Sequence, residues 1–315
     1  MPIGLQRLKY FHEVAAQGSI SAAARALGIA QPALSYQMQA IERELGTAVF
    51  ERSNRGVALT AAGALLYRRA DRLIEELDDI EREVRSNAHV AHGTVRLALA
   101  VTMARMMVPE ILAIAGARLP QVDVKIADVA SVPAVAMMQS GQADLALAPN
   151  AAEMEDCLIE PLYRERLCLI AARGEGDGDD GRPIALRDIG ERPLVLSARQ
   201  FDLRRRVEEA AIEAGARLNV RYEQDSQETI RSIVTAGLAA TISQAAQFHP
   251  VTERPRLSIR PIVEPEIART HSIVRRDARR PTSATLAIAG VVREATANLV
   301  AGGVFPGRLL GGPSR

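Results

Sequence analysis

The side chains with the clearest chemical potential lie in one short polar stretch near the N-terminus, and they are hydrogen-bonding groups rather than nucleophiles. Gln31, Ser35 and Tyr36 are spaced so that they share one face of a helix. A glutamine amide can pair with adenine, and a serine hydroxyl can donate to or accept from several bases. A tyrosine in such a place can reach a sugar-phosphate oxygen or pack on a thymine methyl group. This chemistry indicates recognition of DNA rather than catalysis.

Three short helices are predicted to position this polar face. The first carries an apolar stripe and is broken by Gly18, the second covers residues 22–27 and ends at Gly28, and the third has Pro32 in its first turn and Gly46 just past its end. The third helix has apolar residues at helical spacing: Leu34, Met38, Ile41 and Leu45. Two helices joined by a tight glycine turn form a helix-turn-helix, whose second helix is sized to enter the DNA major groove.

A small hairpin is predicted over residues 47–59, with a turn at Asn54-Arg55-Gly56. It would form a wing, with Arg52 and Arg55 placed to meet phosphate or the minor groove. Residues 1–60 hold six basic and four acidic side chains, a net charge of +2, although the whole chain has a net charge of only +1. A three-helix bundle used for protein contacts is the alternative interpretation.

A long helix is predicted to follow, from a cap at Thr60 to about His89. Its apolar positions alternate four and three apart and form a narrow seam that does not bury itself. The 3.5-residue period favours pairing with the same helix of a second subunit. The residues predicted to dimerise are Leu66, Leu73, Leu77, Ile80 and Val84. The alternative is an amphipathic helix that lies on its own domain.

From Thr94 onward, strand-like runs alternate with helical runs, and a final helix spans residues 282–300. This alternation predicts mostly parallel sheets with helices on both faces. About 200 residues are enough for two small lobes. The fold class is therefore α/β with an all-α/winged N-terminal domain.

Composition and cysteine content exclude several other classes. A chain of 315 residues that is 48% hydrophobic is too apolar for a disordered protein. Cys157 and Cys168 cannot form a disulfide framework or a thiolate zinc site, and the histidines form no clear metal cluster. Glycines and acidic residues at 174–180 fit neither a phosphate loop nor a calcium loop. We therefore predict no catalytic residue, no metal and no cofactor.

No targeting or membrane segment is predicted either. The N-terminus lacks the apolar core and cleavage site of a signal peptide. Charged residues interrupt the apolar stretch 95–117, so it is not a membrane span. The expected location is the cytoplasm, with no membrane partner.

An ordered set of residues in the first 65 positions resembles the amino-terminal signature of LysR-type transcriptional regulators. The residues that carry the resemblance are Phe11, Gly18-Ser19-Ile20-Ser21-Ala22-Ala23-Ala24, Leu27-Gly28-Ile29-Ala30-Gln31-Pro32-Ala33-Leu34-Ser35, Ile41-Glu42, Leu45-Gly46, Phe50-Glu51-Arg52 and Leu59-Thr60-Ala61-Ala62-Gly63. Within the family, Arg7-Leu8-Lys9-Tyr10-Phe11 and residues 29–35 resemble the nitrogen-assimilation-control branch.

The resemblance implies a domain division and a DNA-contacting set. Residues 1–60 would form a winged helix-turn-helix DNA-binding domain, 61–92 a dimerising linker helix and hinge, and 93–302 a two-lobed effector-binding domain similar to periplasmic binding proteins. Residues 303–315 contain several glycines and have little to bury, so their composition predicts a disordered tail. The residues predicted to contact DNA are Gln31, Pro32, Ala33, Ser35, Tyr36, Gln39, Arg52 and Arg55.

In such a domain the effector lies between the lobes, where strand ends meet helix starts. Unpaired N–H groups there favour a small anion or carboxylate. The positions that match the family's usual effector contacts are Thr102, Met103, Ser131, Ser197, Arg199, Ser226 and Thr229. Helix capping is the alternative role for the serines, and Arg199 could equally be a surface residue. Many members carry Leu-Pro where this chain has Ser243-Gln244, a difference that bears on the cleft floor.

The predicted function is sequence-specific DNA binding that regulates transcription and is modulated by a small-molecule effector. The expected partners are double-stranded promoter DNA, a small anionic effector, a second copy in a homodimer or homotetramer, and RNA polymerase if the protein is an activator. The rival interpretation is a small-molecule-binding protein or enzyme whose helical head only assembles subunits.

Overall fold

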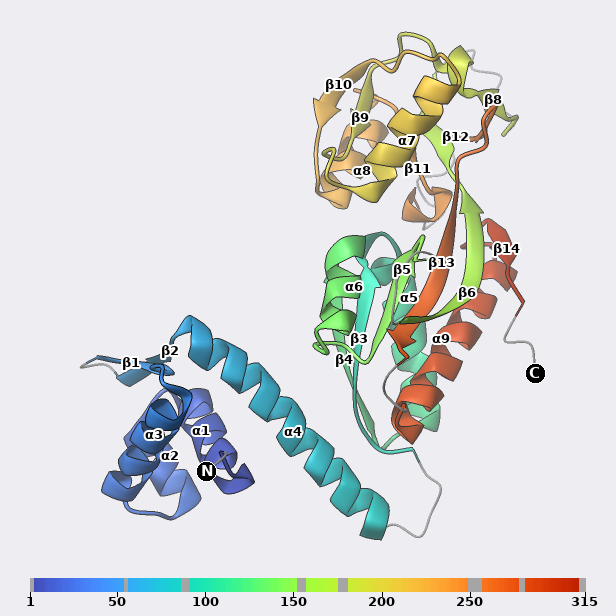
Figure 1. Cartoon of the computed structure of the whole chain (residues 1–315). Coiled ribbons are helices and arrows are strands. Elements are labelled where there is room, and N and C mark those ends of the chain that lie inside the picture. Colours follow the sequence, from blue (N-terminus) through green and yellow to red (C-terminus); the bar gives the residue numbers. More distant parts are fainter. Residues whose placement is uncertain are drawn as a thin grey trace. The chain divides into compact units, whose positions relative to one another are not determined.

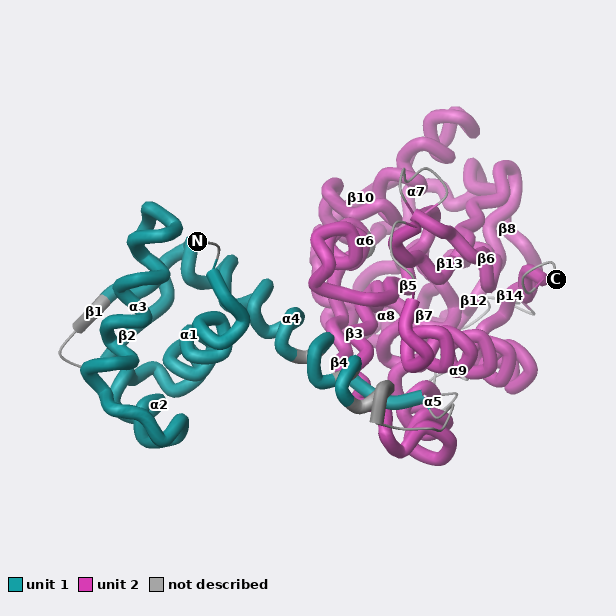
Figure 2. The backbone as a smooth tube through the Cα atoms, turned by 60° about the horizontal axis from the view of Figure 1, so that its bottom comes forward, with its two compact units in different colours: residues 1–93 teal, residues 94–315 magenta. Residues whose placement is uncertain are grey.

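The computed structural model describes residues 3–53, 56–85, 91–151, 157–174, 181–248, 257–277 and 281–311. It divides into two compact units, residues 1–93 and 94–315 (Figure 2).

The first unit contains three helices, a hairpin and one long helix (Figure 1). These are α1 (Leu5–Gln17), α2 (Ile20–Leu27), α3 (Gln31–Leu45), β1 (Phe50–Ser53), β2 (Gly56–Leu59) and α4 (Ala61–Arg85). Helices α1, α2 and α3 end at Gly18, Gly28 and Gly46, whose φ angles of 61°, 67° and 65° are left-handed. The helices enclose a core that includes Phe11, Leu34, Met38 and Ile41, all 0% exposed.

Side-chain hydrogen bonds and one close backbone contact hold the hairpin against the helices. The Glu42 carboxylate accepts hydrogen bonds from the backbone N–H groups of Val49 (3.0 Å) and Phe50 (3.2 Å). Thr60 caps α4, because its hydroxyl accepts from the N–H of Gly63 at 3.0 Å. A Cβ atom on Gly63 would lie 2.0 Å from the carbonyl oxygen of Val49, so only glycine fits where α4 crosses the hairpin.

The second unit consists of two lobes, and lobe I is built on a six-stranded sheet in the order β14-β6-β13-β5-β3-β4. The strands are β3 (Gly93–Ala100), β4 (Val122–Val129), β5 (Leu145–Pro149), β6 (Cys157–Arg166), β13 (Ala268–Arg276) and β14 (Gly307–Leu309). Its helices are α5 (Val101–Arg118), α6 (Ser131–Gln139) and α9 (Ser283–Ala301). Strand β5 is fully buried, as expected for a central strand whose residues are all apolar.

Lobe II contains a four-stranded sheet, β11-β7-β12-β8, and the pair β10-β9. A bridge between Leu194 and Ala240 joins the two sets of strands. The strands are β7 (Cys168–Ala172), β8 (Ile184–Ala185), β9 (Leu194–Leu196), β10 (Val220–Glu223), β11 (Thr241–Ser243) and β12 (Leu257–Val263). The helices are α7 (Asp202–Glu213), α8 (Gln227–Thr235) and the short 3-10 turns η1 (Leu186–Ile189) and η2 (Ala245–Phe248).

Two features of the second unit differ from the sequence expectations. The sheets are mixed rather than mostly parallel, because β6, β13 and β14 pair antiparallel, as do β7, β11 and β12. The expectation of a disordered tail from residue 303 is wrong for Gly307–Leu309, which pair with β6 as β14. A Cβ on Gly307 would lie 2.3 Å from the carbonyl oxygen of Arg164, so this edge pairing depends on glycine.

Helix α9 is the one described helix that is long and apolar enough to cross a membrane by length and composition. It packs beside α5 in lobe I, and Ile288 and Val292 are fully buried. Its apolar character therefore has a structural explanation as a core helix of this lobe.

Candidate DNA-binding surface and ligand cleft

The exposed face of α3 carries most of the predicted DNA-contacting side chains. Gln31, Pro32, Ala33, Tyr36 and Gln39 are exposed, and Ser35 is half-buried. The opposite face of the helix is buried in the core, so the polar face cannot turn inward. Tyr36 is 59% exposed on this face.

Arg43 adds a cation to this face, although it was not in the predicted set. Its guanidinium lies 5.5 Å from the centre of the Tyr36 ring, and its Nε donates to the carbonyl oxygen of Gln39 at 3.4 Å. This cation–π contact holds the two side chains together on the surface. On the wing, Arg52 lies in β1 opposite Val57, and Arg55 lies outside the described residues.

Helix α4 uses its apolar seam in two ways. Leu66 packs against the core of the first unit, and Ala70 is fully buried there. Farther along, Leu73 is 52% exposed, Ile80 is 50% exposed and Leu77 is half-buried. The side chain of Val84 lies outside the described residues. The first part of the predicted seam, around Leu66 and Ala70, therefore packs within the first unit. The second part, from Leu73 to Ile80, has apolar side chains that are exposed in a single chain.

A cavity of about 290 Å³ lies between the two lobes of the second unit. Three helices begin at residues that line it. The residues before α5, α6 and α7 are Ala100, Ala130 and Phe201, and none of them provides a side-chain cap. First-turn N–H groups that lack a side-chain acceptor carry partial positive charge. The cavity is therefore suited to an anionic group.

Two buried hydroxyl groups face this cavity, one from each lobe. Thr102 lies in the first turn of α5, and Ser197 follows β9. Within the part of the chain that the structure describes, neither Thr102 Oγ1 nor Ser197 Oγ has a hydrogen-bond partner. An unpaired buried hydroxyl costs free energy, and a ligand that hydrogen-bonds to it would recover that cost.

A buried ionic network lies beside the cavity. Arg269 of β13 lines the cavity and is 2% exposed, and it donates to Glu165 of β6 at 2.6 Å. The two residues are register partners on adjacent antiparallel strands. His271 Nε2 lies 2.8 Å from the same carboxylate oxygen. Burial alone raises the pKa of Glu165, but the charges and hydrogen bonds of His271 and Arg269 together lower it by more than burial raises it, so that its pKa falls to about 2.

Two side chains carry hydrogen bonds from one lobe to the other. Gln244 accepts from Arg269 at 2.6 Å and donates to the carbonyl oxygen of Thr102 at 3.0 Å. Asn150, which follows β5, donates to Asp202 at the start of α7 at 2.9 Å. Gln244 is one of the two residues that replace the usual Leu-Pro of the resembled family, and proline could not make either side-chain bond.

The structure brings only part of the predicted effector set to the cavity. Thr102 and Ser197 line it. Met103 is buried in lobe I and does not line the cavity, and Ser131 begins α6, but its side chain lies outside the described residues. The remaining three predicted residues, Arg199, Ser226 and Thr229, do not line the cavity either. Arg199 is 77% exposed and pairs with Glu208 at 3.2 Å, while the hydroxyl of Ser226 accepts from the N–H of exposed Thr229 and caps α8.

Sequence reasoning missed Arg269, Asp202 and Gln227, which also line the cavity. Arg269 lies on a strand that was not predicted, because polar and apolar residues mix along it without a clear period. Gln227 follows Ser226 directly, so the prediction reached the correct loop and selected its capping residue instead.

Comparison with known proteins agrees with both parts of the architecture. Residues 5–64 match the bacterial regulatory helix-turn-helix protein family, lysR type, and residues 88–297 match the LysR substrate binding domain. The chain is 31% identical over 241 residues to the HTH-type transcriptional regulator BbuR of Bordetella bronchiseptica, covering 76% of this chain and 74% of that protein.

Other relatives have similar coverage. The nitrogen assimilation regulatory protein Nac of Klebsiella aerogenes is 29% identical over 76% of this chain and 78% of its own length. Full-length CbnR solved with its target DNA has a TM-score of 0.66 at 23% identity, covering 93% of this chain and all of CbnR (100%). Full-length OxyR of Pseudomonas aeruginosa has a TM-score of 0.65 at 20% identity, covering 94% and 95%. The chain belongs to the LysR family of transcriptional regulators, which bind DNA through the helix-turn-helix and carry an effector-binding domain.

Proposed function

We propose that α3 reads base edges in the major groove through Gln31, Ser35 and Tyr36, with Arg43 held beside Tyr36 to meet phosphate. The observation that supports this most directly is the one-sided exposure of α3, whose apolar positions are buried and whose polar positions face solvent. Pro32, Ala33 and Gln39 complete the surface, and Arg52 and Arg55 are proposed to meet phosphate or the minor groove from the wing. The solved complex of CbnR with DNA has the same fold and supports this use of the domain.

The DNA-binding unit acts as a dimer in this proposal. The open part of the α4 seam, Leu73, Leu77 and Ile80, would pair with the same residues of a second copy, followed by Val84. A dimer presents two α3 helices to two half-sites, which matches a dyad-related promoter sequence. A homotetramer on two separated sites, contact with RNA polymerase if the protein activates, and a cytoplasmic location complete the expected setting. Placement in the Nac-like branch remains a prediction.

The effector is a small carboxylate or similar anion bound in the inter-lobe cavity. Three helix starts without side-chain caps supply N–H donors, and Thr102 and Ser197 supply two hydroxyls without partners. The charge of Arg269 is already neutralised by Glu165, so Arg269 adds no unpaired positive charge to the cavity. Its role is to hold Gln244 in place through a hydrogen bond. A cavity of about 290 Å³ fits a compact molecule.

Binding would change DNA recognition by shifting the lobes. Among the described residues, Gln244 makes two hydrogen bonds and Asn150 makes one that join the lobes beside the cavity. An effector that contacts Thr102 in one lobe and Ser197 in the other would favour one lobe arrangement, and this preference must come from different affinities for the two arrangements.

The buried thiol of Cys168 does not suit peroxide sensing, although OxyR proteins are among the similar structures. Burial raises the pKa of the Cys168 thiol to about 12. The thiolate is the reactive species, so Cys168 stays protonated and unreactive at neutral pH. Cys157 lies at the start of β6 and is partly buried.

A mobility-shift assay on the gene's own upstream DNA tests the recognition helix. We expect Gln31→Ala or Ser35→Ala to weaken specific binding about tenfold, which corresponds to the loss of a base contact. Gln17→Ala removes an exposed glutamine from α1 and serves as the matched control, with no expected loss. Equal binding by all three variants and the unchanged protein would refute the assignment of α3.

Thermal denaturation with a panel of small carboxylic acids and their amides tests the effector class. An acid that binds the folded protein raises the melting temperature by mass action, and its neutral amide does not. The shift should shrink in Ser197→Ala. Stabilisation by the amides alone, or an unchanged shift in Ser197→Ala, would contradict the anionic assignment of this cavity.

A further inference from the structure

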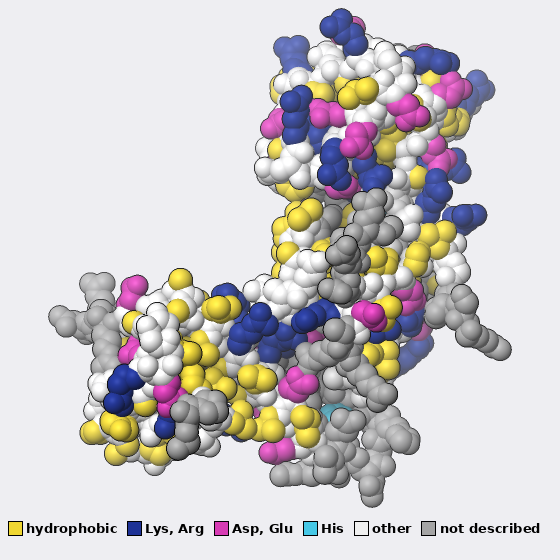
Figure 3. Space-filling model, viewed as in Figure 1, with side chains coloured by type: hydrophobic (Ala, Val, Ile, Leu, Met, Phe, Trp, Pro, Cys, Tyr) yellow, Lys and Arg dark blue, Asp and Glu magenta, His cyan; other side chains and the backbone are white. Residues whose placement is uncertain are grey.

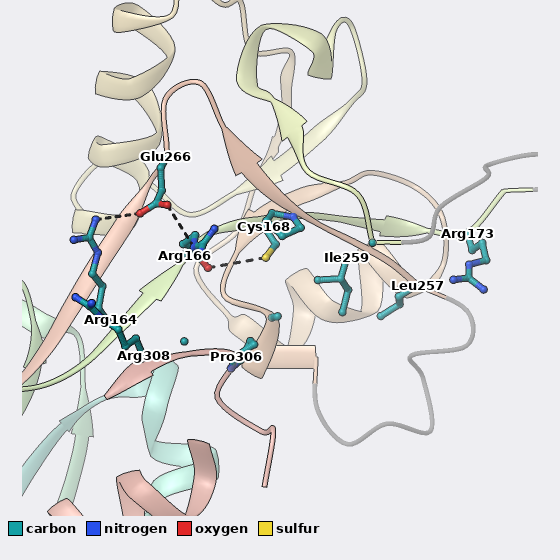
Figure 4. Close-up of a pocket in the computed structure, with 13 residues that line it drawn as sticks. Arg164, Arg166, Cys168, Arg173, Leu257, Ile259, Glu266, Pro306 and Arg308 are labelled. Carbon is teal, nitrogen blue, oxygen red and sulfur yellow. Dashed lines mark hydrogen bonds and ion pairs between the residues drawn. The ribbon is translucent and has the colours of Figure 1, made fainter. Parts of the chain in front are cut away.

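A second and larger pocket lies on the second unit, away from the residues of the inter-lobe cavity (Figure 4). Its volume is about 1060 Å³. The β7–β12 pair supplies an apolar floor that includes Cys168, Leu257, Ile259 and Pro261, and Pro306 lies at its edge. No residue is shared between the linings of the two sites.

Four arginines and one glutamate line this pocket. Arg164 and Arg166 come from β6, Arg173 follows β7, and Arg308 lies on β14. Among the described lining residues Glu266 is the one carboxylate, and it pairs with Arg164 at 3.0 Å and with Arg166 at 3.4 Å. The lining residues that the structure describes therefore carry a net charge of +3, from four positive groups and one negative group. In Figure 3, dark-blue side chains gather on the side of the second unit where Figure 1 labels β6 and β14.

The register of β14 and β6 places two of these positive charges directly opposite each other. Arg308 is the cross-strand partner of Arg164, and Arg166 lies two residues farther on the same face of β6. Like charges directly opposite in an antiparallel pair destabilise the pairing. Arg308 has no ion pair or hydrogen bond from its side chain among the described residues. This arrangement leaves positive potential that a bound anion would relieve.

The pocket is separate from the ionic network beside the effector cavity because of strand alternation. Glu165 points to the buried side of β6, where it meets Arg269 and His271. Arg164 and Arg166 flank it and are 49% and 59% exposed on the other side. The buried carboxylate therefore does not neutralise the pocket arginines by direct contact.

We propose that this arginine-lined pocket is a second ligand site that binds a small organic polyanion, independently of the effector cavity. Planar guanidinium groups bind carboxylate and phosphate oxygens through paired hydrogen bonds, so two or more oxyanion groups can be held at once. The apolar floor requires that the ligand also carry a carbon framework or ring. The volume lies at the upper end of small-molecule sites, which fits a nucleotide-sized molecule. Phosphate esters and polycarboxylates share this chemistry.

Calorimetric titration of the full-length protein with three probes tests the proposal. The probes are adenosine triphosphate without magnesium, citrate, and inorganic phosphate. We expect one of the two organic anions to bind, more tightly than inorganic phosphate because it also covers the apolar floor. Tight binding of the triphosphate identifies phosphate esters, and tight binding of citrate identifies polycarboxylates.

Charge reversal at the pocket supplies the decisive comparison. Arg308→Glu should weaken binding by about tenfold or more, because a charge-assisted contact is lost and a repulsive carboxylate is added. Arg217→Glu reverses an exposed arginine elsewhere on lobe II and should leave the affinity unchanged. Equal affinities for the two variants, or no organic anion binding better than inorganic phosphate, would overturn the proposal. Reduced DNA binding by Arg308→Glu with no probe bound would instead assign these arginines to DNA.

Discussion

Replacing Arg269 should show how much the buried ionic network beside the effector cavity contributes to the stability of the folded protein. Arg269 is 2% exposed and Glu165 is 4% exposed, and their closest contact is 2.6 Å. The change Arg269→Met keeps most of the side-chain volume and removes the charge. The Glu165 carboxylate then remains buried with His271 as its neighbour at 2.8 Å, and Gln244 loses its donor.

The expected loss in the free energy of unfolding follows from the buried Glu165 carboxylate, which remains after Arg269 is removed. Breaking a buried ion pair by deleting one partner typically costs about 3–5 kcal/mol, because the remaining charge is buried and uncompensated. We expect about 3 kcal/mol here, at the low end, since His271 still contacts the carboxylate. Replacing both partners, as in Arg269→Met with Glu165→Leu, should recover a large part of this loss, because no unpaired charge then remains.

Urea denaturation of the full-length protein, followed by circular dichroism, measures these differences. The single and double variants form a cycle whose coupling energy should be about 1–3 kcal/mol. Glu294→Leu, which breaks an ion pair with exposed Arg118, provides a control for charge removal near the surface and should show weak coupling to Arg118. A coupling energy near zero between Arg269 and Glu165 would refute the claim that this pair acts as one buried unit.

Three further predictions follow from the same structure. The folded-state pKa of Glu165 is about 2, below its ordinary value of 4.5, so the stability that its carboxylate contributes should be present above pH 4.5 and lost as the pH falls towards 2. Glu165→Gln should make the free energy of unfolding depend less on pH in denaturation curves recorded across that range. Gly63→Ala should cost about 1–3 kcal/mol, because its Cβ would meet the Val49 carbonyl oxygen at 2.0 Å, and an unchanged melting temperature would contradict this contact. Leu73→Asp with Ile80→Asp should shift the protein towards monomers in sedimentation and leave the fold of each chain intact, whereas an unchanged dimer would place the interface elsewhere.

The DNA-binding unit was predictable from the sequence because its signals are local. Gly18, Gly28 and Gly46 mark helix ends through their left-handed backbone, and apolar spacing alone orients α3. The same local reasoning located Thr102 and Ser197, which lie where a strand gives way to a helix or loop.

The buried network was not predictable in this way. Glu165 and Arg269 are separated by 104 positions, and each would be assigned to the surface by its residue type. Only the antiparallel pairing of β6 with β13 brings them together. Arg308 likewise falls in a segment expected to be disordered, and its position opposite Arg164 depends on an edge strand of three residues.

Salt dependence of binding to DNA tests the central claim most directly. Fluorescence anisotropy with labelled duplex from the gene's own upstream region gives the affinity of the full-length protein at each ionic strength. If paired α3 helices and wings contact phosphates, the logarithm of the affinity should fall linearly with the logarithm of salt concentration, with a steep slope that reflects several released counterions. Absence of binding at every ionic strength, or an affinity that does not change with salt, would contradict the account.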